Sequence, residues 1–318
     1  MTPRRRIIFS VDVEDWPQSS WDRDLPIGKE CADTARRLLD LMAACPGARG
    51  TFFVLGKFAE VHPDVVRAIH RGGHEVASHG YGHEEIFRID RRAFQEDLDR
   101  STDLVGNITG ERPRGYRAPD FSIVSETLWA LDALAERGYS YDSSIFPLDR
   151  GRYGIQGWPR EPRRIHLRTG GSILEFPLTV ASWHGRLWPI SGGGYARLLP
   201  RPVLRRAFER EAKQRSVPPV FYCHPYEADP NEFRRLRVPV PLKVRLHQNL
   251  GRRGFTAKLK MLFEQFDCCS FEQAIREMPA IPEFDYSPFE TAAVARSGLF
   301  AIRHHIVPAN VASQGHES

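Results

Sequence analysis

The chain has 318 residues, of which 41% are hydrophobic and 27% charged, and its formal net charge is +5. This composition excludes a disordered or collagen-like chain and is typical of a globular protein with a sizeable core. No stretch approaches the roughly 18 apolar residues of a membrane span, and the start lacks the apolar run of a secretory signal. We therefore expect a cytoplasmic protein without a transmembrane segment.

Strand and helix patterns alternate along the first half of the chain. Residues 5–15 predict a buried strand, because every second residue from Ile7 to Val13 is apolar. Further strands are expected at 51–55, 74–80, 113–120, 140–146, 172–178 and 218–227, and helices at 31–45, 62–73, 91–110, 125–139, 200–214 and 255–266. Such alternation favours parallel strands covered by helices. Polar residues at the carboxyl ends of the strands favour a barrel over an open sheet.

The stretch HEVASHGYGHEE, residues 74–85, concentrates histidines and glutamates. It does not fit the zinc-protease pattern HExxH, because Ser78 stands where the second histidine is needed. His79 and His83 are separated by Gly-Tyr-Gly, which favours a loop after a strand. Two histidines at this spacing are either a metal-binding pair or ordinary surface residues.

Acidic residues at the end of the first strand favour the metal-binding interpretation. Asp12, Glu14 and Asp15 follow one another closely there, and buried acids are costly unless they pair or bind a cation. One carboxylate and two neutral imidazoles, with positions left open for water, form a hydrolytic metal site. Arg117 and His224, at the ends of later strands, add a cation and a group that titrates near neutral pH.

Five motifs in this order resemble the NodB-type polysaccharide deacetylases, carbohydrate esterase family 4. The motifs are SVDVEDW, SHGYGH, GYRAPDFS, YDSSIFP and FYCHPYE. The segments GGGYARLLP and HQNLGRRGFTAKLKMLFEQF are similar to the subgroup found in bacterial exopolysaccharide loci, which has a distinctive C-terminal region. The resemblance extends over roughly residues 5 to 275.

The resemblance implies a distorted (β/α)7 barrel of the NodB type with a C-terminal extension. We expect a barrel at 5–235 and an extension packed on it at 236–300. We also expect a flexible tail at 301–318, because the C-terminal residues show no pattern. The resemblance also implies a divalent metal, most often Zn²⁺, and hydrolysis of acetyl groups on sugars.

The histidine motif of the family falls on His79 and His83, with Gly80 where the family has a hydroxyl residue. The remaining motifs fall on Arg117 with Pro119, which would lie at the substrate, and on His224.

The first motif can be aligned with the family's Thr-Phe-Asp-Asp-Gly in two registers. One register makes Glu14 the general base and Asp15 the metal ligand. The other makes Asp12 the base and leaves Val13 where a ligand is needed. We favour the first register because it is chemically complete, although Asp12 and Glu14 point to one side of an ideal strand and Asp15 to the other.

The predicted reaction is metal-assisted amide hydrolysis. Arg117 would orient the base, and protonated His224 would donate its proton to the leaving amine. Asp142 either orients His224 or caps a strand end. Aromatic residues in the long loops between 147 and 195 are candidates for stacking on sugar rings. These candidates are Trp183, Trp188 and Tyr195.

Charge is concentrated in residues 201–260, which contain 15 Lys+Arg and 5 Asp+Glu. The segment is either a solvated surface or a basic rim for an anionic glycan or a lipid-linked sugar, with peripheral contact at the inner membrane face. Aromatic residues are not interleaved with these charges, so nucleic acid is not expected. Two other functions remain open: hydrolysis of a small cyclic amide, and glycan binding without catalysis.

Overall fold

The computed structural model describes residues 4–168 and 170–290. Its strands are β1 (Arg6–Val13), β2 (Thr51–Val54), β3 (Glu75–Ser78), β4 (Gly115–Tyr116), β5 (Tyr141–Asp142), β6 (Arg163–His166), β7 (Ser172–Glu175), β8 (Val180–Trp183), β9 (Arg186–Pro189), β10 (Val220–Cys223), β11 (Asp267–Cys269) and β12 (Glu283–Phe284). Its α-helices are α1 (Lys29–Ala43), α2 (Gly56–Val61), α3 (Pro63–Arg71), α4 (Arg91–Thr109), α5 (Trp129–Glu136), α6 (Gly193–Leu198), α7 (Arg201–Gln214), α8 (Glu232–Arg235), α9 (Leu242–Asn249), α10 (Phe255–Gln265) and α11 (Phe271–Glu277).

The main sheet is almost entirely parallel. Its strand order is β10-β1-β2-β3-β4-β5-β7-β6-β12, and only the β6–β7 pair is antiparallel. The strand β1 lies between β10 and β2, with Val11 opposite both Cys223 and Phe52. Since parallel neighbours end at the same edge, residues that follow β1, β3, β4 and β10 are brought together.

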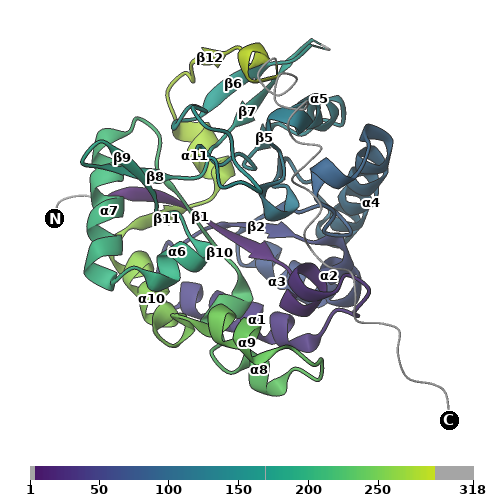
Figure 1. Ribbon diagram of the computed structural model, residues 1–318, viewed down its shortest axis with the longest axis vertical. Coiled ribbons are helices and arrows are strands. Elements are labelled where there is room, and N and C mark those ends of the chain that lie inside the picture. The colour runs from purple at the N-terminus through teal and green to yellow at the C-terminus, as the bar shows by residue number, and fades with distance from the viewer. Residues whose placement is uncertain (1–3, 169, 291–318) are drawn as a thin grey trace.

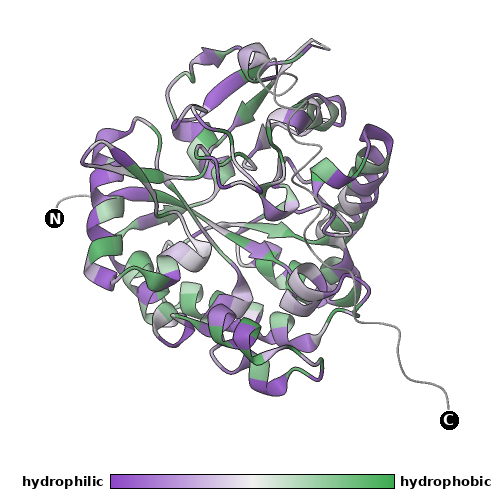
Figure 2. Cartoon of the chain, viewed as in Figure 1, coloured by the Kyte–Doolittle hydropathy of each residue, from purple (hydrophilic) through white to green (hydrophobic). Residues whose placement is uncertain are grey.

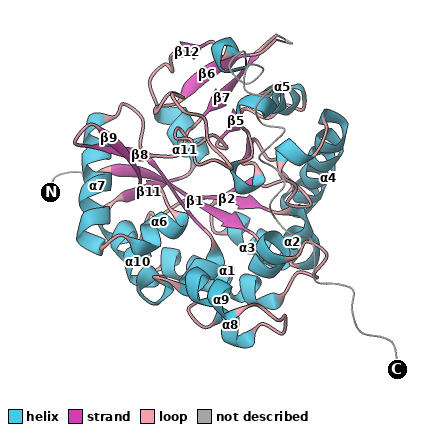
Figure 3. Cartoon of the chain, viewed as in Figure 1, coloured by secondary structure: helices cyan, strands magenta, loops and turns pink. Residues whose placement is uncertain are grey.

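Helices surround the strands on the outside of the molecule (Figures 1 and 3). The apolar residues are concentrated on the strands and on the inward faces of the helices (Figure 2). From Ile7 to Val13, every residue of β1 is buried, which is typical of a strand covered on both sides. This arrangement confirms the predicted α/β fold with a mainly parallel sheet.

The expected strands and helices of the first 146 residues are present, and several short helical elements lie between them. The short helix α2 follows β2 directly, where the sequence indicated only the end of a strand. Further along, the region expected to be long loops contains β6, the β8–β9 hairpin and α6. Strands of four residues rarely show a clear alternation, which explains why the pattern was missed.

The C-terminal part of the described chain belongs to the same sheet. The strand β11 pairs with β1 in parallel, with Ile7 opposite Cys268, and β12 pairs with β6. The expected boundary at 235 therefore precedes segments that extend the sheet, and it stays a prediction. Residues 291–300 of the expected extension and the expected tail at 301–318 lie outside the described residues.

Across the described residues, none of the helices is both long and apolar enough to cross a membrane.

Candidate functional site

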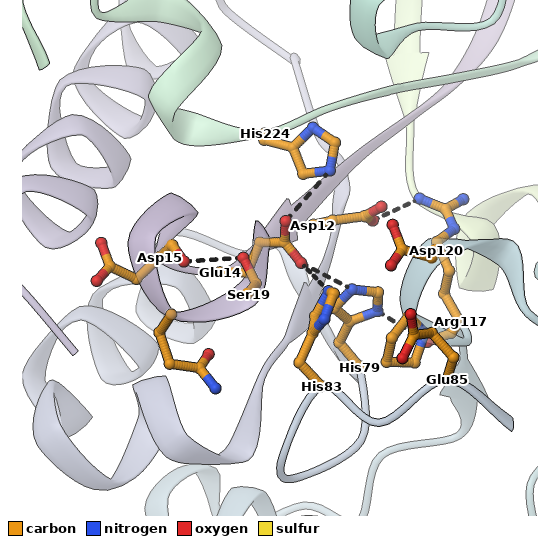
Figure 4. A network of polar contacts seen from close by, with 12 residues as sticks. Asp12, Glu14, Asp15, Ser19, His79, His83, Glu85, Arg117, Asp120 and His224 are labelled. Atoms are coloured by element: carbon orange, nitrogen blue, oxygen red, sulfur yellow. Dashed lines mark hydrogen bonds and ion pairs between the residues drawn. The ribbon is translucent and has the colours of Figure 1, made fainter. Parts of the chain in front are cut away.

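Five polar side chains meet at the carboxyl ends of four strands of the main sheet (Figure 4). Asp12 and Glu14 come from the end of β1, His79 follows β3, Arg117 follows β4 and His224 follows β10. All of these side chains except His224 are fully buried, and His224 is partly exposed. The site therefore has one titratable group at its opening and the others below it.

Glu14 and two histidines form the centre of the site. One carboxylate oxygen of Glu14, Oε2, lies 3.2 Å from Nε2 of His79 and 2.6 Å from Nε2 of His83. Burial would raise the pKa of Glu14, but the charge of His83 and hydrogen bonds from both histidines hold it well below its usual range. Burial would lower the pKa of His83, and Glu14 raises it instead. The three residues therefore form one tightly coupled cluster.

The backbone fixes the orientation of His79. Its Nδ1 lies 2.8 Å from the carbonyl oxygen of Arg117, which can only accept a hydrogen bond. Nδ1 therefore donates to this carbonyl, and Nε2 is directed at Glu14. A histidine held by its other ring nitrogen in this way is typical of metal ligands.

The loop between the two histidines is held by a carboxylate of α4. Oxygens of Asp97 accept hydrogen bonds from the backbone N–H groups of Tyr81, at 2.8 Å, and Gly82, at 2.9 Å. Gly80 has a φ of 73°, and a Cβ there would lie 2.7 Å from Asp97 Oδ2. The hydroxyl of Ser78 accepts from the N–H of Gly80 at 3.1 Å. The positive φ and the nearby carboxylate favour glycine, so a hydroxyl residue at this position would be strained.

Asp12 and Arg117 form a buried ion pair beside the cluster. Nη1 of Arg117 donates to Oδ1 of Asp12 at 2.7 Å and to the hydroxyl of Ser10 at 2.9 Å. The remaining donors of Arg117 bind the carbonyl and hydroxyl oxygens of Ser143, both at 3.0 Å. The ring of Phe53 lies 4.1 Å below the guanidinium. Arg117 is therefore fixed in position and in turn fixes the carboxylate of Asp12.

His224 lies on the other side of Glu14 and is oriented by Glu227. Its Nε2 lies 3.6 Å from Glu14 Oε1, and its Nδ1 lies 3.2 Å from Glu227 Oε2. Arg197 pairs with the second oxygen of Glu227 at 2.9 Å. Burial would lower the pKa of His224, but the bond to Glu227 and the nearby carboxylates raise it to about 9. The carboxylates therefore favour the protonated form of His224.

Two residues of the site were missed in the sequence, although both lie in the quoted motif FYCHPYE. They are Glu227 and Tyr226. The hydroxyl of Tyr226 donates to Glu14 Oε1 at 3.2 Å, and its ring stacks on that of His224 with ring centroids 4.7 Å apart. Glu227 follows His224 by three residues, and a carboxylate at that spacing can reach back to a histidine at the end of a strand. This spacing could have identified Glu227 from the sequence.

Asp15 lies away from the histidines, so its expected place beside them is wrong. After Val13 the chain enters a short helical turn, and the alternation of an extended strand leaves Glu14, not Asp15, on the side of Asp12. Oδ2 of Asp15 accepts from the N–H of Gly28 at 2.9 Å. Burial raises the pKa of Asp15 to about 6. Neither of the two registers considered for the sequence describes this geometry, in which Glu14 takes the ligand position.

Asp142 does not orient His224. Its carboxylate accepts from the N–H of Ser144 at 2.9 Å and from the hydroxyl of the same residue at 2.5 Å. It is buried beside Glu175, and burial raises the pKa of both carboxyl groups. Asp142 therefore caps a strand end, which was the other interpretation of this residue, and Glu227 occupies the place beside His224.

The expected substrate-binding residues lie in different surroundings. Pro119 is buried at the start of a turn in which Asp120 and Phe121 both have a positive φ, 52° and 53°. Trp183 and Trp188 lie on the β8–β9 hairpin and are 61% and 50% exposed. Tyr195, on α6, is partly buried, with its hydroxyl 3.4 Å from that of Tyr153 and the guanidinium of Arg150 5.5 Å from its ring centroid.

The donor set of the cluster fits a divalent cation. One ligand atom each from Glu14, His79 and His83 lies within 4.8 Å of the other two. Two imidazole nitrogens and one carboxylate oxygen are a ligand set that zinc accepts, with further positions left open. The fixed ring of His79 and the unpartnered, buried Nδ1 of His83 are consistent with ligation through the two Nε2 atoms.

Two family models match the chain. Residues 21–141 match the polysaccharide deacetylase model, and residues 143–276 match a domain of unknown function (DUF3473). Among curated proteins, a peptidoglycan deacetylase-like protein FGM2 of Gibberella zeae is 32% identical over 152 residues, 42% of this chain and 41% of that protein. The peptidoglycan deacetylase of Helicobacter pylori is 32% identical over 108 residues, 33% of this chain and 35% of that protein. The chain thus spans less than half of the length of these relatives.

Solved structures resemble the whole described fold. A structure described as a polysaccharide deacetylase from Mycobacterium smegmatis has a TM-score of 0.55 at 20% identity, covering 99% of this chain and 97% of that one. Puue allantoinase has a TM-score of 0.50 at 17% identity, covering 91% and 90%. At these identities the likeness concerns the fold. The chain therefore matches the polysaccharide deacetylase model over residues 21–141 and shares the NodB-like α/β fold of these solved structures.

Proposed function

We propose that this protein is a metal-dependent deacetylase that hydrolyses N-acetyl groups of a bacterial polysaccharide or of its lipid-linked precursor. One observation carries the proposal: a buried group of Glu14, His79 and His83 lies between the Asp12–Arg117 pair and His224. A cation site, a fixed carboxylate and a protonated histidine are the three parts that amide hydrolysis needs.

Glu14, His79 and His83 would hold the cation, most simply Zn²⁺. When bound, such a cation polarises the acetyl carbonyl and makes water a better nucleophile at neutral pH. The tight Glu14–His83 pairing supports this assignment, because a cation would take the place of the proton that the two groups otherwise share.

Asp12 would act as the general base in place of Glu14. Its carboxylate lies on the same side of β1 as that of Glu14 and is held by Arg117 at 2.7 Å. A base that is fixed in this way needs no reorganisation before it accepts the proton of the attacking water. Arg117 has no remaining freedom to contact substrate, so we assign it to positioning Asp12.

His224 would act as the general acid on the leaving amine. It is the member of the group with access to solvent, and Glu227 keeps it protonated with Nε2 directed at the site. The negative charge of Glu14 raises the pKa of His224. A cation bound by Glu14 would offset part of that charge and bring the pKa of His224 closer to neutrality.

Sugar binding would involve the exposed aromatic residues of the β8–β9 hairpin. Trp183 and Trp188 are each at least half exposed, so packing in the core does not account for these two large aromatic side chains. Tyr195 and Pro119 would contribute to the walls of the site. The basic segment 201–260 would favour an anionic or lipid-linked substrate, although part of its charge is internal, because Arg252 and Lys258 are buried in hydrogen bonds.

Acetate release from defined substrates tests the proposal. The purified protein, loaded with Zn²⁺, is incubated with an N-acetylglucosamine oligomer, the same oligomer carrying only O-acetyl groups, and allantoin. We expect acetate release from the N-acetylated oligomer, and no release at a comparable rate from the other two substrates. Ring opening of allantoin without acetate release would assign the site to cyclic amides instead. Inactivity on every substrate, with sugar binding retained, would leave a glycan-binding protein.

A further inference from the structure

Helix α9 turns leucine side chains toward solvent. Leu242 is 68% exposed and Leu246 is 61% exposed, and Leu250, directly after the helix, is 53% exposed. Residues four apart lie on one face of a helix, so Leu242 and Leu246 form one stripe. We call Leu242, Leu246 and Leu250 the leucine face. A contiguous exposed apolar stripe of this kind marks a surface that contacts something else.

The leucine face has no part in holding α9 on the molecule. The opposite side of the helix carries Val244, which packs against the buried cluster of Trp16, Tyr226 and Phe233. Arg245 donates to the carbonyl of Phe233 at 2.9 Å. The fold therefore accounts for the inner side of α9 and leaves the leucine face unexplained.

The surroundings of the leucine face are basic. Residues 233–263 contain nine Lys and Arg residues and no Asp or Glu. The nearest preceding acids, Asp229 and Glu232, are buried and paired with Arg235 and Arg252. Four basic side chains of this stretch are exposed and form no ion pair with a described residue, namely Arg234, Arg237, Lys243 and Arg253.

Apolar surface continues on both sides of α9, which lies beside α8 at the lower edge of Figure 1. Before the helix, a groove of about 350 Å³ is lined by Phe233, Leu236, Val238, Pro239, Val240, Pro241 and Arg245. Near the end of the helix, Arg197 of α6 donates to the carbonyl of Gln248. The next residue on α6, Leu198, is 63% exposed. The leucine face is therefore part of a wider apolar surface.

We propose that the leucine face docks this protein on the surface of an anionic lipid bilayer. Leucines would enter the boundary between headgroups and acyl chains, and the exposed Lys and Arg side chains would contact lipid phosphates. Protein interfaces are enriched in aromatic residues and depleted of lysine. Helix α9 has no aromatic residue and carries Lys243 at its second position, which favours a lipid surface over a protein partner. This inference goes beyond the proposed deacetylase function and does not depend on it.

The docking surface is linked to the site through buried contacts. Arg252, three residues after Asn249, donates to the carbonyl of Tyr226 at 2.9 Å. The hydroxyl of Tyr226 reaches Glu14 at 3.2 Å. A short chain of contacts between buried groups thus connects the docking surface with the floor of the site.

Co-sedimentation with vesicles tests the docking surface. The full chain is mixed with vesicles of phosphatidylcholine alone, or with about a third of the lipid replaced by phosphatidylglycerol. We expect pelleting with the anionic vesicles only, and weaker pelleting as the Debye length falls from about 30 Å at 0.01 M to about 10 Å at 0.1 M salt. The double variant Leu242→Ser/Leu246→Ser should lower partitioning about tenfold or more, because each removed leucine loses favourable burial.

Matched controls separate the leucine face from general surface effects. Val61→Ser removes another exposed apolar side chain, on α2, and should pellet like the wild type. Lys243→Glu should weaken pelleting, whereas Arg67→Glu, at an exposed position of α3, should have little effect. Pelleting that the leucine variant leaves unchanged overturns the proposal. A wild type that stays in solution with anionic vesicles at 0.01 M salt also overturns the proposal. If the leucine variant then converts a dimer to a monomer in light scattering, the leucine face is a contact between two copies of the chain.

Discussion

At the scale of single residues, the site depends on which carboxylate of β1 faces the histidines. Two-residue alternation places Asp12 and Glu14 on one side and turns Asp15 to Gly28. This alternation could be predicted from the sequence. The family's motif, however, has two adjacent aspartates, and aligning the chain with it by position led to the assignment of Asp15 as a metal ligand. The local geometry of the strand decides this question, because a carboxylate on the wrong side cannot reach the cation.

The three carboxylates should separate by metal binding and turnover. Glu14→Gln should lose most of its cation affinity, because an amide is a weaker ligand than a carboxylate. Asp12→Asn should keep the cation and lose about 10²–10⁴ in rate, the range of a missing general base. Asp15→Asn, the matched control, should keep both. Metal content by mass spectrometry and acetate release measure the two properties. An Asp15→Asn variant without metal would restore the register favoured for the sequence.

The pH behaviour of His224 should depend on Glu227. In metal-free protein, NMR should show His224 titrating with a pKa of about 9, which is raised because Glu227 stabilises the imidazolium. Glu227→Gln removes this stabilisation, so the pKa should fall. Since the proposed acid is active only when protonated, the alkaline limb of kcat/KM should also move to lower pH in the loaded variant. An alkaline limb that stays in place would assign that ionisation to a group other than His224.

At the scale of elements, the sequence was informative where periodicity was long and failed where strands were short. Helix α4, with 19 residues, and the buried strand β1 were predicted close to their bounds. The strands β6 and β11, of four and three residues, were missed because so few residues show no period. The polar contacts between elements were also out of reach, since Asp97 holds the histidine loop from a helix that begins eight residues after His83.

Loss of Asp97 should loosen the histidine loop. Asp97→Ala leaves the N–H groups of Tyr81 and Gly82 without their acceptor, at a cost of about 1–3 kcal/mol each where water cannot replace it. We expect weaker cation binding with little change in overall helix content, measured by a competition titration and circular dichroism. Asp99→Ala removes an exposed carboxylate from the same helix and serves as the control. Equal cation affinities in the two variants would contradict the role of Asp97.

At the scale of the whole molecule, residues from the C-terminal part complete the region around the site. Arg252 is fully buried and binds Glu232, the carbonyl of Asp229 and the carbonyl of Tyr226. Composition and charge counts treated this arginine as part of a basic surface. Its burial shows that the local charge of a segment describes its surface poorly when several of its cations have internal partners.

Removal of Arg252 should destabilise the molecule as a whole. Arg252→Met leaves Glu232 buried without its cation, and breaking a buried pair costs about 3–5 kcal/mol. The neighbouring exposed residue provides the control, because Arg253→Met should change the free energy of unfolding by less than about 0.5 kcal/mol. Urea titration measures both. Equal unfolding free energies for the two variants would show that Arg252 has no structural role.

The central claim is that acetate release depends on one cation held by Glu14, His79 and His83. The direct measurement is a titration of chelator-treated protein with Zn²⁺ while acetate release from an N-acetylglucosamine oligomer is followed. We predict no acetate without the cation, a linear rise to a plateau at about one equivalent per chain, and no rise for His79→Ala/His83→Ala. Acetate release that survives chelation, or that rises equally in the double variant, would contradict the account.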